Sequence, residues 1–208
     1  AVIGVDEESI ILAAKLSESL CIEHNSLESV KLTKNKYLMR SELKKSGLKS
    51  PWFKRFSVHE TPKDIFAELS FPCVLKPTFL SASQGVLRVN SFEEFEKGCE
   101  MLSDLLAEEK VKKRGGDQAN WILVEEYIPG KEVSIEGIVN DGKLKDLAIF
   151  DKPEPPEGPI FPETIFITPT ILDEHLQFSL LETAQRALQA LGISKGPVHI
   201  ELRINDHG

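Results

Sequence analysis

The sequence predicts an α+β fold, because helical and strand patterns occur in local groups and do not follow a strict strand–helix–strand repeat. The chain has 208 residues, of which 41% are hydrophobic and 28% are charged. This ordinary globular composition suffices for one large domain or two small ones. A Rossmann domain is disfavoured, since no GxGxxG motif follows the first strand-like run.

The first fifty residues predict one strand and two helices. The apolar run 1–5 is a strand candidate, and Asp6 can cap a helix that runs to about Leu20 with an apolar stripe at helical spacing. A second helix is predicted with Thr33 as its N-cap and Gly47 at its C-terminal end.

The next seventy residues predict three strands and two helices. Strands are expected at 52–58, at 71–76 and in the few residues that end at Val89. A short helix begins at Pro62, and Ser91 caps an amphipathic helix from Phe92 to about Lys110. The polar stretch 112–118 is predicted to be a mobile connection.

From Trp121 the chain is rich in strand patterns, at 121–125, 132–139, 144–150, near Ile165 and at 198–204. The tripeptide Asn140-Asp141-Gly142 predicts a tight hairpin between the second and third of these strands. A proline-rich loop at 153–159 follows, and a helix is predicted from Asp173 to Leu191.

Charge, apolar runs and cysteines limit the function classes. A net charge of −8 and a pI of about 5.3 argue against a nucleic-acid binder, which would carry a basic surface. No run approaches the roughly 18 apolar residues of a membrane helix, and no secretion signal begins the chain. Cys21, Cys73 and Cys99 lack the spacing of a zinc site, so we expect free thiols and a cytoplasmic protein.

The two ends predict a piece of a longer protein. The chain begins without Met inside the strand-like run 1–5, and it stops at Asp206-His207-Gly208, which has the composition of a hairpin turn. We therefore expect one or more strands beyond Gly208.

The first candidate site is a lysine beside a loop of small residues. Lys76 ends an apolar strand, where a lone ammonium is poorly placed for burial, and the loop 81–86 (SASQGV) follows. One point charge and several backbone N–H donors suit a nucleotide polyphosphate. A solvent-exposed lysine beside a polar loop fits the same residues equally well, and the GxxxxGK[ST] order of a P-loop is absent.

The second candidate site is the strand 198–204. Its alternation places His199, Glu201 and Arg203 on one face and apolar residues on the other. The stretch 132–136 (EVSIE) alternates in the same way. Such a face is typical either of plain solvent exposure or of a hard-metal site with a cation beside it.

Two further features are ambiguous alone. Residues 123–137 (LVEEYIPGKEVSIEG) place carboxylates on both sides of a Pro129-Gly130 turn. A solvated hairpin explains the turn but does not require those carboxylates. Lys34 and Lys36 are expected to be surface lysines unless another motif involves them.

Taken together, these stretches resemble the ATP-grasp superfamily, and within it the carboxylate–amine ligases of the amino-acid ligase type. The resemblance rests on the order and spacing of the whole set, since no single motif is decisive. It implies two α+β lobes that grip ATP. The implied parts are the end of a preceding α/β domain at 1–30, a connecting helix and strand at 31–70, a small lid lobe at 71–128 and a large lobe at 129–208 that is incomplete at its C-terminus.

The resemblance also implies roles for individual residues. The nucleoside contacts would come from a hinge that 124–132 resembles: Glu126 C=O and Ile128 N–H on the adenine edge, Tyr127 between them, Glu125 beside the exocyclic amine and Glu132 on the ribose hydroxyls. The phosphate contacts would come from two lysines and the lid loop, namely Lys36, Lys76, Ser81, Ser83, Gly85 and Val86. Asn35 stands where the family usually has aspartate before the first of these lysines.

The same resemblance implies the metal site and the substrate side. Glu201 corresponds to the first magnesium carboxylate, while the second carboxylate and a substrate arginine would lie beyond Gly208. His199 is implied as a substrate-side or phosphate-side group, and Arg203 as a catalytic one. The segment 151–161 is a candidate cover over the substrate, since long irregular segments often serve this way.

The implied reaction is ATP-dependent ligation. ATP with Mg²⁺, or with Mn²⁺ in its place, would activate a small carboxylate as an acylphosphate, and an amine would displace the phosphate. Amino acids are candidate substrates, no nucleic acid or membrane partner is expected, and a homodimer is allowed. Two alternatives stay open: a biotin carboxylase-like enzyme, whose lid would be a glycine run in place of residues 81–84, and a nucleotide-binding module without turnover.

Overall fold

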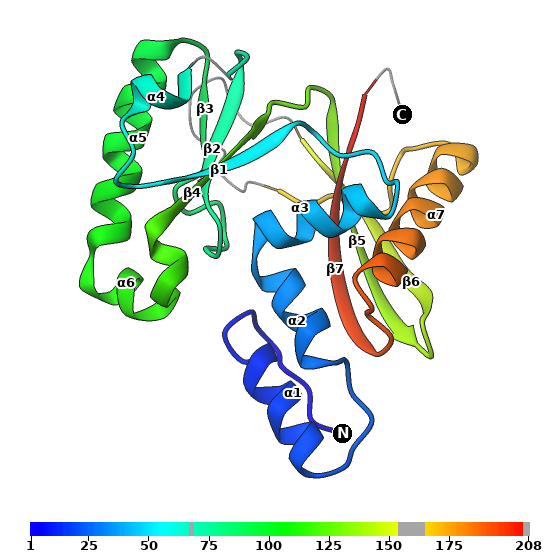
Figure 1. Ribbon diagram of the computed structural model, residues 1–208. Coiled ribbons are helices and arrows are strands. Elements are labelled where there is room, and N and C mark those ends of the chain that lie inside the picture. The colour runs from blue at the N-terminus through cyan, green and yellow to red at the C-terminus, as the bar shows by residue number, and fades with distance from the viewer. Residues whose placement is uncertain (67–68, 154–164, 206–208) are drawn as a thin grey trace. The chain divides into compact units, whose positions relative to one another are not determined.

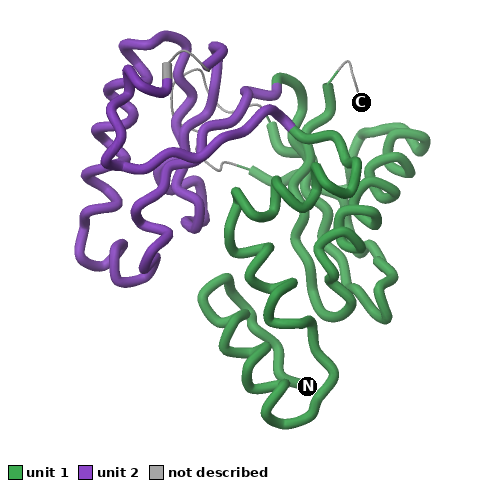
Figure 2. The backbone as a smooth tube through the Cα atoms, viewed as in Figure 1, with its two compact units in different colours: residues 1–50, 129–154, 164–208 green, residues 51–128, 155–163 purple. Residues whose placement is uncertain are grey.

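The computed structural model describes residues 1–66, 69–153 and 165–205, which divide into two compact units (Figure 2). Among these residues, unit 1 takes in 1–50, 129–153 and 165–205, and unit 2 takes in 51–66 and 69–128. Each unit contains one antiparallel sheet and its own helices (Figure 1). This arrangement confirms the α+β prediction.

Unit 2 is built on a four-stranded sheet in the order β1 (Phe53–Ser57), β4 (Trp121–Glu126), β2 (Cys73–Pro77) and β3 (Leu87–Val89). The long helix α5 (Phe92–Ala107) packs on it, and Leu75, Phe95 and Ile122 are fully buried between them. Ser91 caps α5 by accepting from the Glu94 N–H, as predicted, and α4 (Pro62–Phe66) begins at the predicted proline.

The mobile connection predicted at 112–118 is wrong. These residues belong to helix α6 (Glu109–Gly115) and to the 3₁₀ helix η1 (Gly116–Asn120). Val111 packs against the unit 2 core, and Gly115 lies so close to the Phe79 ring that a Cβ would come within 2.3 Å of it. The basic composition indicated a solvated loop, but α6 buries one face and keeps its charged side chains outside.

Unit 1 is built on a three-stranded sheet in which β5 (Lys131–Asn140) lies between β6 (Lys143–Lys152) and β7 (Gly196–Ile204) (Figure 1). Helix α7 (Glu174–Ala190) covers one face, with Leu180 and Ala184 packed against Val133 and Ile135. The predicted hairpin between β5 and β6 is confirmed, because Asp141 and Gly142 both have positive φ, as a type I′ turn requires.

The N-terminal part of unit 1 contains three helices, α1 (Ile10–Ser19), α2 (Leu27–Lys34) and α3 (Lys36–Lys45). The strand predicted at 1–5 is wrong, because no strand of the described residues pairs with this run, and Val5 is 90% exposed. The helix predicted from Asp6 begins later, after a turn in which the Asp6 carboxylate accepts from the Ser9 N–H.

The predicted N-cap Thr33 is also wrong. Thr33 lies inside α2, where its Oγ1 donates to the Val30 carbonyl. Asn35 caps α3 instead, by accepting from the N–H groups of Tyr37 and Leu38. The sequence prediction thus began this helix slightly early, inside α2, a helix that it did not include.

The link between β4 and β5 is not a hairpin. Strand β4 pairs with β1 and β2, whereas β5 pairs with β6 and β7, so the solvated-hairpin interpretation of 123–137 is wrong. The chain passes from unit 2 to unit 1 between Ile128 and Pro129. Gly130 has a φ of +105°, and a Cβ there would lie 2.0 Å from the Ile204 carbonyl oxygen, so only glycine fits.

Three sequence predictions fall wholly or largely outside the described residues: the proline-rich loop 153–159, the candidate cover 151–161 and the turn 206–208. The strand expected near Ile165 is reduced to one antiparallel bridge between Asp151 and Ile167. Across 1–66, 69–153 and 165–205, no helix has both the length and the apolar composition to cross a membrane.

Candidate active site

The face of the unit 1 sheet opposite α7 is lined with polar side chains. Because side chains alternate along a strand, residues 132, 134 and 136 of β5 share this face with their cross-strand neighbours. The register gives three rows across β6, β5 and β7: Lys152–Glu132–Arg203, Phe150–Ser134–Glu201 and Ala148–Glu136–His199. The predicted alternation of 198–204 is confirmed, since Ile200 and Leu202 pack into the α7 side.

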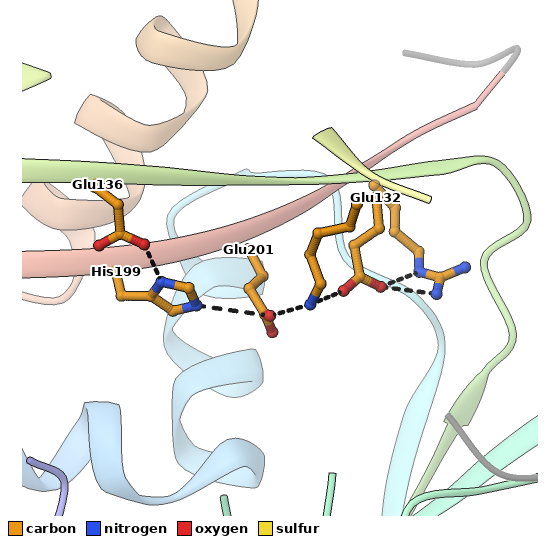
Figure 3. Close-up of polar contacts among 6 residues, drawn as sticks. Glu132, Glu136, His199 and Glu201 are labelled. Carbon is orange, nitrogen blue, oxygen red and sulfur yellow. Dashed lines mark hydrogen bonds and ion pairs between the residues drawn. The ribbon is translucent and has the colours of Figure 1, made fainter. Parts of the chain in front are cut away.

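Six of these side chains form a continuous row of alternating charge, which we call the charged row (Figure 3). At one end Arg203 donates to Glu132 Oε2 from Nη2 at 2.8 Å and from Nε at 3.1 Å. Lys152 Nζ lies 2.5 Å from Oε1 of both Glu132 and Glu201. At the other end His199 Nε2 lies 3.6 Å from Glu201 Oε1, and its Nδ1 lies 2.5 Å from Oε1 of the sixth residue, Glu136. Unit 1 thus brings four predicted site residues together: Glu132, His199, Glu201 and Arg203.

The contacts of the charged row shift its pKa values so that the charged forms are favoured. The Glu201 carboxylate beside its ring, together with the hydrogen bond to Glu136, outweighs burial and raises the pKa of His199 to about 9. The His199 ring beside it, together with the hydrogen bond from Lys152, outweighs burial and lowers the pKa of Glu201 to about 2. At neutral pH the row therefore holds an imidazolium beside a carboxylate.

Lys152 and Glu136 are the two members of the row that were not among the predicted site residues, and of these Lys152 lies outside every strand that the sequence predicted. Burial lowers the pKa of Lys152, but the hydrogen bonds to Glu132 and Glu201 raise it by more than burial lowers it. The net shift is upward, so the ammonium stays charged. The predicted strand ended at Phe150, two residues short of the observed end of β6. Continuing the alternation by one step would have placed Lys152 on the polar face opposite Glu132.

The carboxylate of Glu132 is already heavily used. It accepts two hydrogen bonds from Arg203 on Oε2 and one from Lys152 on Oε1. A carboxylate has about four lone-pair positions, so about one remains. Binding both hydroxyls of a ribose therefore requires Lys152 or Arg203 to move away from Glu132.

Unit 2 brings Lys76 and Glu125 together. Lys76 Nζ donates to Glu125 Oε1, and the two side chains are only 13% and 7% exposed. The register of β2 and β4 places them on neighbouring strands, with Val74 opposite Glu125 and Lys76 opposite Leu123. The expectation that Lys76 would avoid burial is wrong, because Glu125 supplies the charge that makes burial tolerable.

The predicted lid loop has an unusual backbone. Ala82 and Ser83 have φ values of +52° and +54°, which cost about 1 kcal/mol or more each in a residue other than glycine. Gly85 also has a positive φ, and a Cβ there would lie 2.8 Å from Leu105. Within the described residues, the hydroxyls of Ser81 and Ser83 make no hydrogen bond, so the loop presents donors that a phosphate could use.

The predicted hinge leaves β4 at Glu126. The Glu126 N–H donates to the Trp52 carbonyl at 2.8 Å, and its carboxylate accepts from the Trp52 N–H at 3.3 Å. The Arg88 guanidinium lies 4.1 Å from the centre of the Tyr127 ring. Trp52 and Arg88 both belong to unit 2, so these contacts fix the segment 126–127, which leads to Ile128, to that unit.

Lys36 is the first residue of α3. The preceding Asn35 is 8% exposed and fully engaged as the N-cap. Asparagine and aspartate cap helices about equally well, so Asn35 can replace the aspartate usual in the resembling family without changing how α3 begins.

The donor set suits a hard divalent cation only together with a ligand. Among the described residues, no group of three or more His, Cys, Asp or Glu side chains is arranged to hold a metal. Mg²⁺ does not need such a cage, because it is commonly bound by one or two carboxylates together with substrate phosphates and water. Glu201, which is ionised and 45% exposed, fits that role.

The chain is similar to known proteins by family profile, by sequence and by structure. The profile of the family described as ATP-grasp domain matches residues 69–208. An alanine–anticapsin ligase of Bacillus subtilis is 32% identical over 203 residues, which cover 92% of this chain and 42% of the relative. The crystal structure of an L-amino acid ligase from Bacillus licheniformis has a TM-score of 0.84 and 29% identity over 98% of this chain and 47% of that one.

A biotin carboxylase from Campylobacter jejuni is also similar, with a TM-score of 0.72 over 99% of this chain and 45% of that one. Its identity of 18% shows a shared fold alone. The chain spans about two fifths of the length of the alanine–anticapsin ligases that it matches.

Proposed function

The chain belongs to the ATP-grasp family, and from that membership we propose that the protein is an ATP-dependent carboxylate–amine ligase acting on amino acids. The γ-phosphoryl group of ATP passes to an oxygen of a carboxylate, which releases ADP. The amine nitrogen then bonds to the acyl carbon, phosphate leaves with the bond electrons, and the amine loses a proton. The substrate class comes from the ligases to which the chain is similar.

The charged row is the observation that carries this proposal. It places three cationic side chains and three carboxylates on one sheet face, with Lys152 Nζ 2.5 Å from Oε1 of both Glu132 and Glu201. Phosphoryl transfer depends chiefly on alignment and on neutralising negative charge. A face with preformed positive groups beside an ionised carboxylate meets both needs.

We assign Glu132 to the ribose hydroxyls and Lys152 to the phosphates. Ribose binding draws Glu132 away from Lys152, and the ammonium released in this way is free to contact a phosphate oxygen. Glu201 would hold Mg²⁺, which when bound would offset the negative charge that develops during phosphoryl transfer. Arg203 holds Glu132 through two hydrogen bonds, so we place it as a residue that orients this carboxylate, in place of the catalytic role predicted from the sequence.

In unit 2 we assign Lys76 to the phosphates and Glu125 to the adenine amine. Their ion pair keeps the buried ammonium neutralised until a nucleotide arrives. Backbone groups of Glu126 and Ile128 read adenine, Tyr127 lies between them, and the loop from Ser81 to Val86 covers the phosphates. Lys36 supplies a further cation.

We propose Mg²⁺, replaceable by Mn²⁺, as the metal, and the cytoplasm as the location. Mg²⁺ is supported by Glu201, because an ionised single carboxylate is a common protein ligand for this ion. The three free cysteines support a reducing compartment. The net charge of −8 argues against a nucleic-acid partner.

ADP release by the full-length protein tests the function. Purified protein is mixed with ATP, Mg²⁺ and pairs of L-amino acids that include alanine, and products are read by mass spectrometry. We expect ADP release that needs both a carboxylate and an amine, with an amide product lighter than its precursors by one water. ADP release that depends on bicarbonate and biotin, with no amide, would favour the carboxylase alternative instead.

A further inference from the structure

Ser134 is a buried hydroxyl in the middle of the charged face. It lies between Glu132 and Glu136 on β5 and directly opposite Glu201 on β7. The residue is 0% exposed, and its Oγ has no hydrogen-bond partner among the residues that the structure describes. A buried hydroxyl without a partner is destabilising, whereas alanine would fit the same place without that penalty.

The carboxylate opposite Ser134 is only half used. Lys152 and His199 both contact Oε1 of Glu201, and within the described part of the chain the second oxygen, Oε2, makes no hydrogen bond or ion pair. Directly opposite residues of an antiparallel pair have Cβ atoms about 4.5–5.5 Å apart. A glutamate side chain that turns slightly can therefore bring its second oxygen to the Ser134 hydroxyl.

We propose that Ser134 is a positioning residue for the divalent cation: its hydroxyl donates to Glu201 and fixes the direction in which that carboxylate faces the metal. This proposal rests on the proposed function, in which Glu201 is the metal carboxylate. While Lys152 and His199 hold Oε1, Ser134 stays without a partner. Once nucleotide draws Lys152 away, Glu201 turns and the serine hydroxyl replaces the lost contact.

The proposal explains why a serine occupies this position. Carboxylates that bind metals are usually held by a further hydrogen bond, and losing that bond commonly weakens metal binding by 10- to 100-fold. Phe150, the other cross-strand neighbour of Ser134, offers no hydrogen-bonding group. Glu201 is thus the cross-strand neighbour that can use the hydroxyl.

The test measures metal binding without turnover. Full-length protein is saturated with the β,γ-imido analogue of ATP, and free Mn²⁺ is followed by electron paramagnetic resonance. We expect Ser134→Ala to bind Mn²⁺ 10- to 100-fold more weakly than wild type. Ser134→Thr and Ser134→Val have equal shape and differ only in the hydroxyl, so the first should bind Mn²⁺ more tightly by a similar factor.

Two controls separate positioning from a structural role. In a Glu201→Gln background, Ser134→Ala should weaken Mn²⁺ binding no further. Without nucleotide or metal, Ser134→Ala should melt at the same temperature as wild type or higher, because it removes an unpaired buried hydroxyl. Thr78→Val removes another buried hydroxyl without a partner, in unit 2, and should leave Mn²⁺ binding unchanged.

The outcomes distinguish the two proposals. If Glu201→Gln weakens Mn²⁺ binding but Ser134→Ala does not, the role of Ser134 is wrong while the metal site stands. If Ser134→Ala weakens Mn²⁺ binding equally with and without Glu201, Ser134 does not act through that carboxylate. If Glu201→Gln binds Mn²⁺ as wild type does, both the metal assignment and the role of Ser134 fail.

Discussion

Replacing Lys152 with methionine perturbs the charged row at its centre. The ammonium contacts both Glu132 and Glu201 at 2.5 Å, and its side chain is only 12% exposed. Without it, two carboxylates face each other and only Arg203 still neutralises Glu132. Hydrogen bonds to charged groups contribute about 1.5–3 kcal/mol each when buried, but water screens the more exposed Glu201 contact. We therefore expect a total loss of about 2–3 kcal/mol in the free energy of unfolding.

Lys97→Met is the matched control for this variant. Lys97 pairs with Glu93 at 2.8 Å, nearly the same distance, but both side chains are more than two thirds exposed. Water screens such an exposed pair on a helix surface, so it contributes little to stability. Methionine keeps most of the apolar stem in both variants, so the charge is the main difference.

Urea unfolding of the full-length protein in metal-free buffer, followed by circular dichroism, gives both free energies. The expected order is a large loss for Lys152→Met and a small one for Lys97→Met, with unchanged m-values. Equal losses in the two variants would refute the view that the charged row is a tightly coupled structure.

Three further predictions concern the nucleotide and the thiols. Lys76→Ala should weaken ATP binding by roughly tenfold to more than a hundredfold in calorimetry. It should also lower stability, because Glu125 stays buried without its cation. Adding Glu125→Gln should restore stability but not affinity, and unchanged ATP affinity in Lys76→Ala would contradict the assignment of Lys76 to the phosphates. ATP should be preferred over GTP by about 5- to 150-fold, since GTP presents a carbonyl to the Glu126 C=O, and equal turnover would contradict the hinge. Burial raises the pKa of Cys73 and of Cys99 to about 12. Iodoacetamide at pH 8 should therefore modify the exposed Cys21 but neither buried cysteine until urea is added. Mass spectrometry after digestion identifies the labelled cysteines, and labelling of Cys73 or Cys99 in the folded protein would contradict the prediction.

Much of the charged row could be predicted because β-strand alternation is strictly local. Once 198–204 is identified as a strand, the period of two places His199, Glu201 and Arg203 on one face, and the apolar residues between them fix which face is buried. The stretch 132–136 follows by the same rule, and pairing of the two strands brings the faces together.

The parts that could not be predicted depend on distant contacts. The run 1–5 has strand composition, but a strand forms only with a partner, and none of the described strands pairs with it. The break between α2 and α3 arises from the Asn35 cap, which helical periodicity does not register. Lys152 was missed because the strand was ended too early, and the partnership of Lys76 with Glu125 joins residues 49 positions apart.

Formation of an acylphosphate, the central step of the proposed function, can be followed with oxygen-18. The amino acid that gives the most ADP release with the full-length protein is labelled with ¹⁸O in its carboxylate, and the reaction is run with ATP and Mg²⁺. Attack of the carboxylate on the γ-phosphorus carries one labelled oxygen into the inorganic phosphate, which mass spectrometry detects. We predict one ¹⁸O in phosphate for each amide formed; amide formation with unlabelled phosphate would contradict the account.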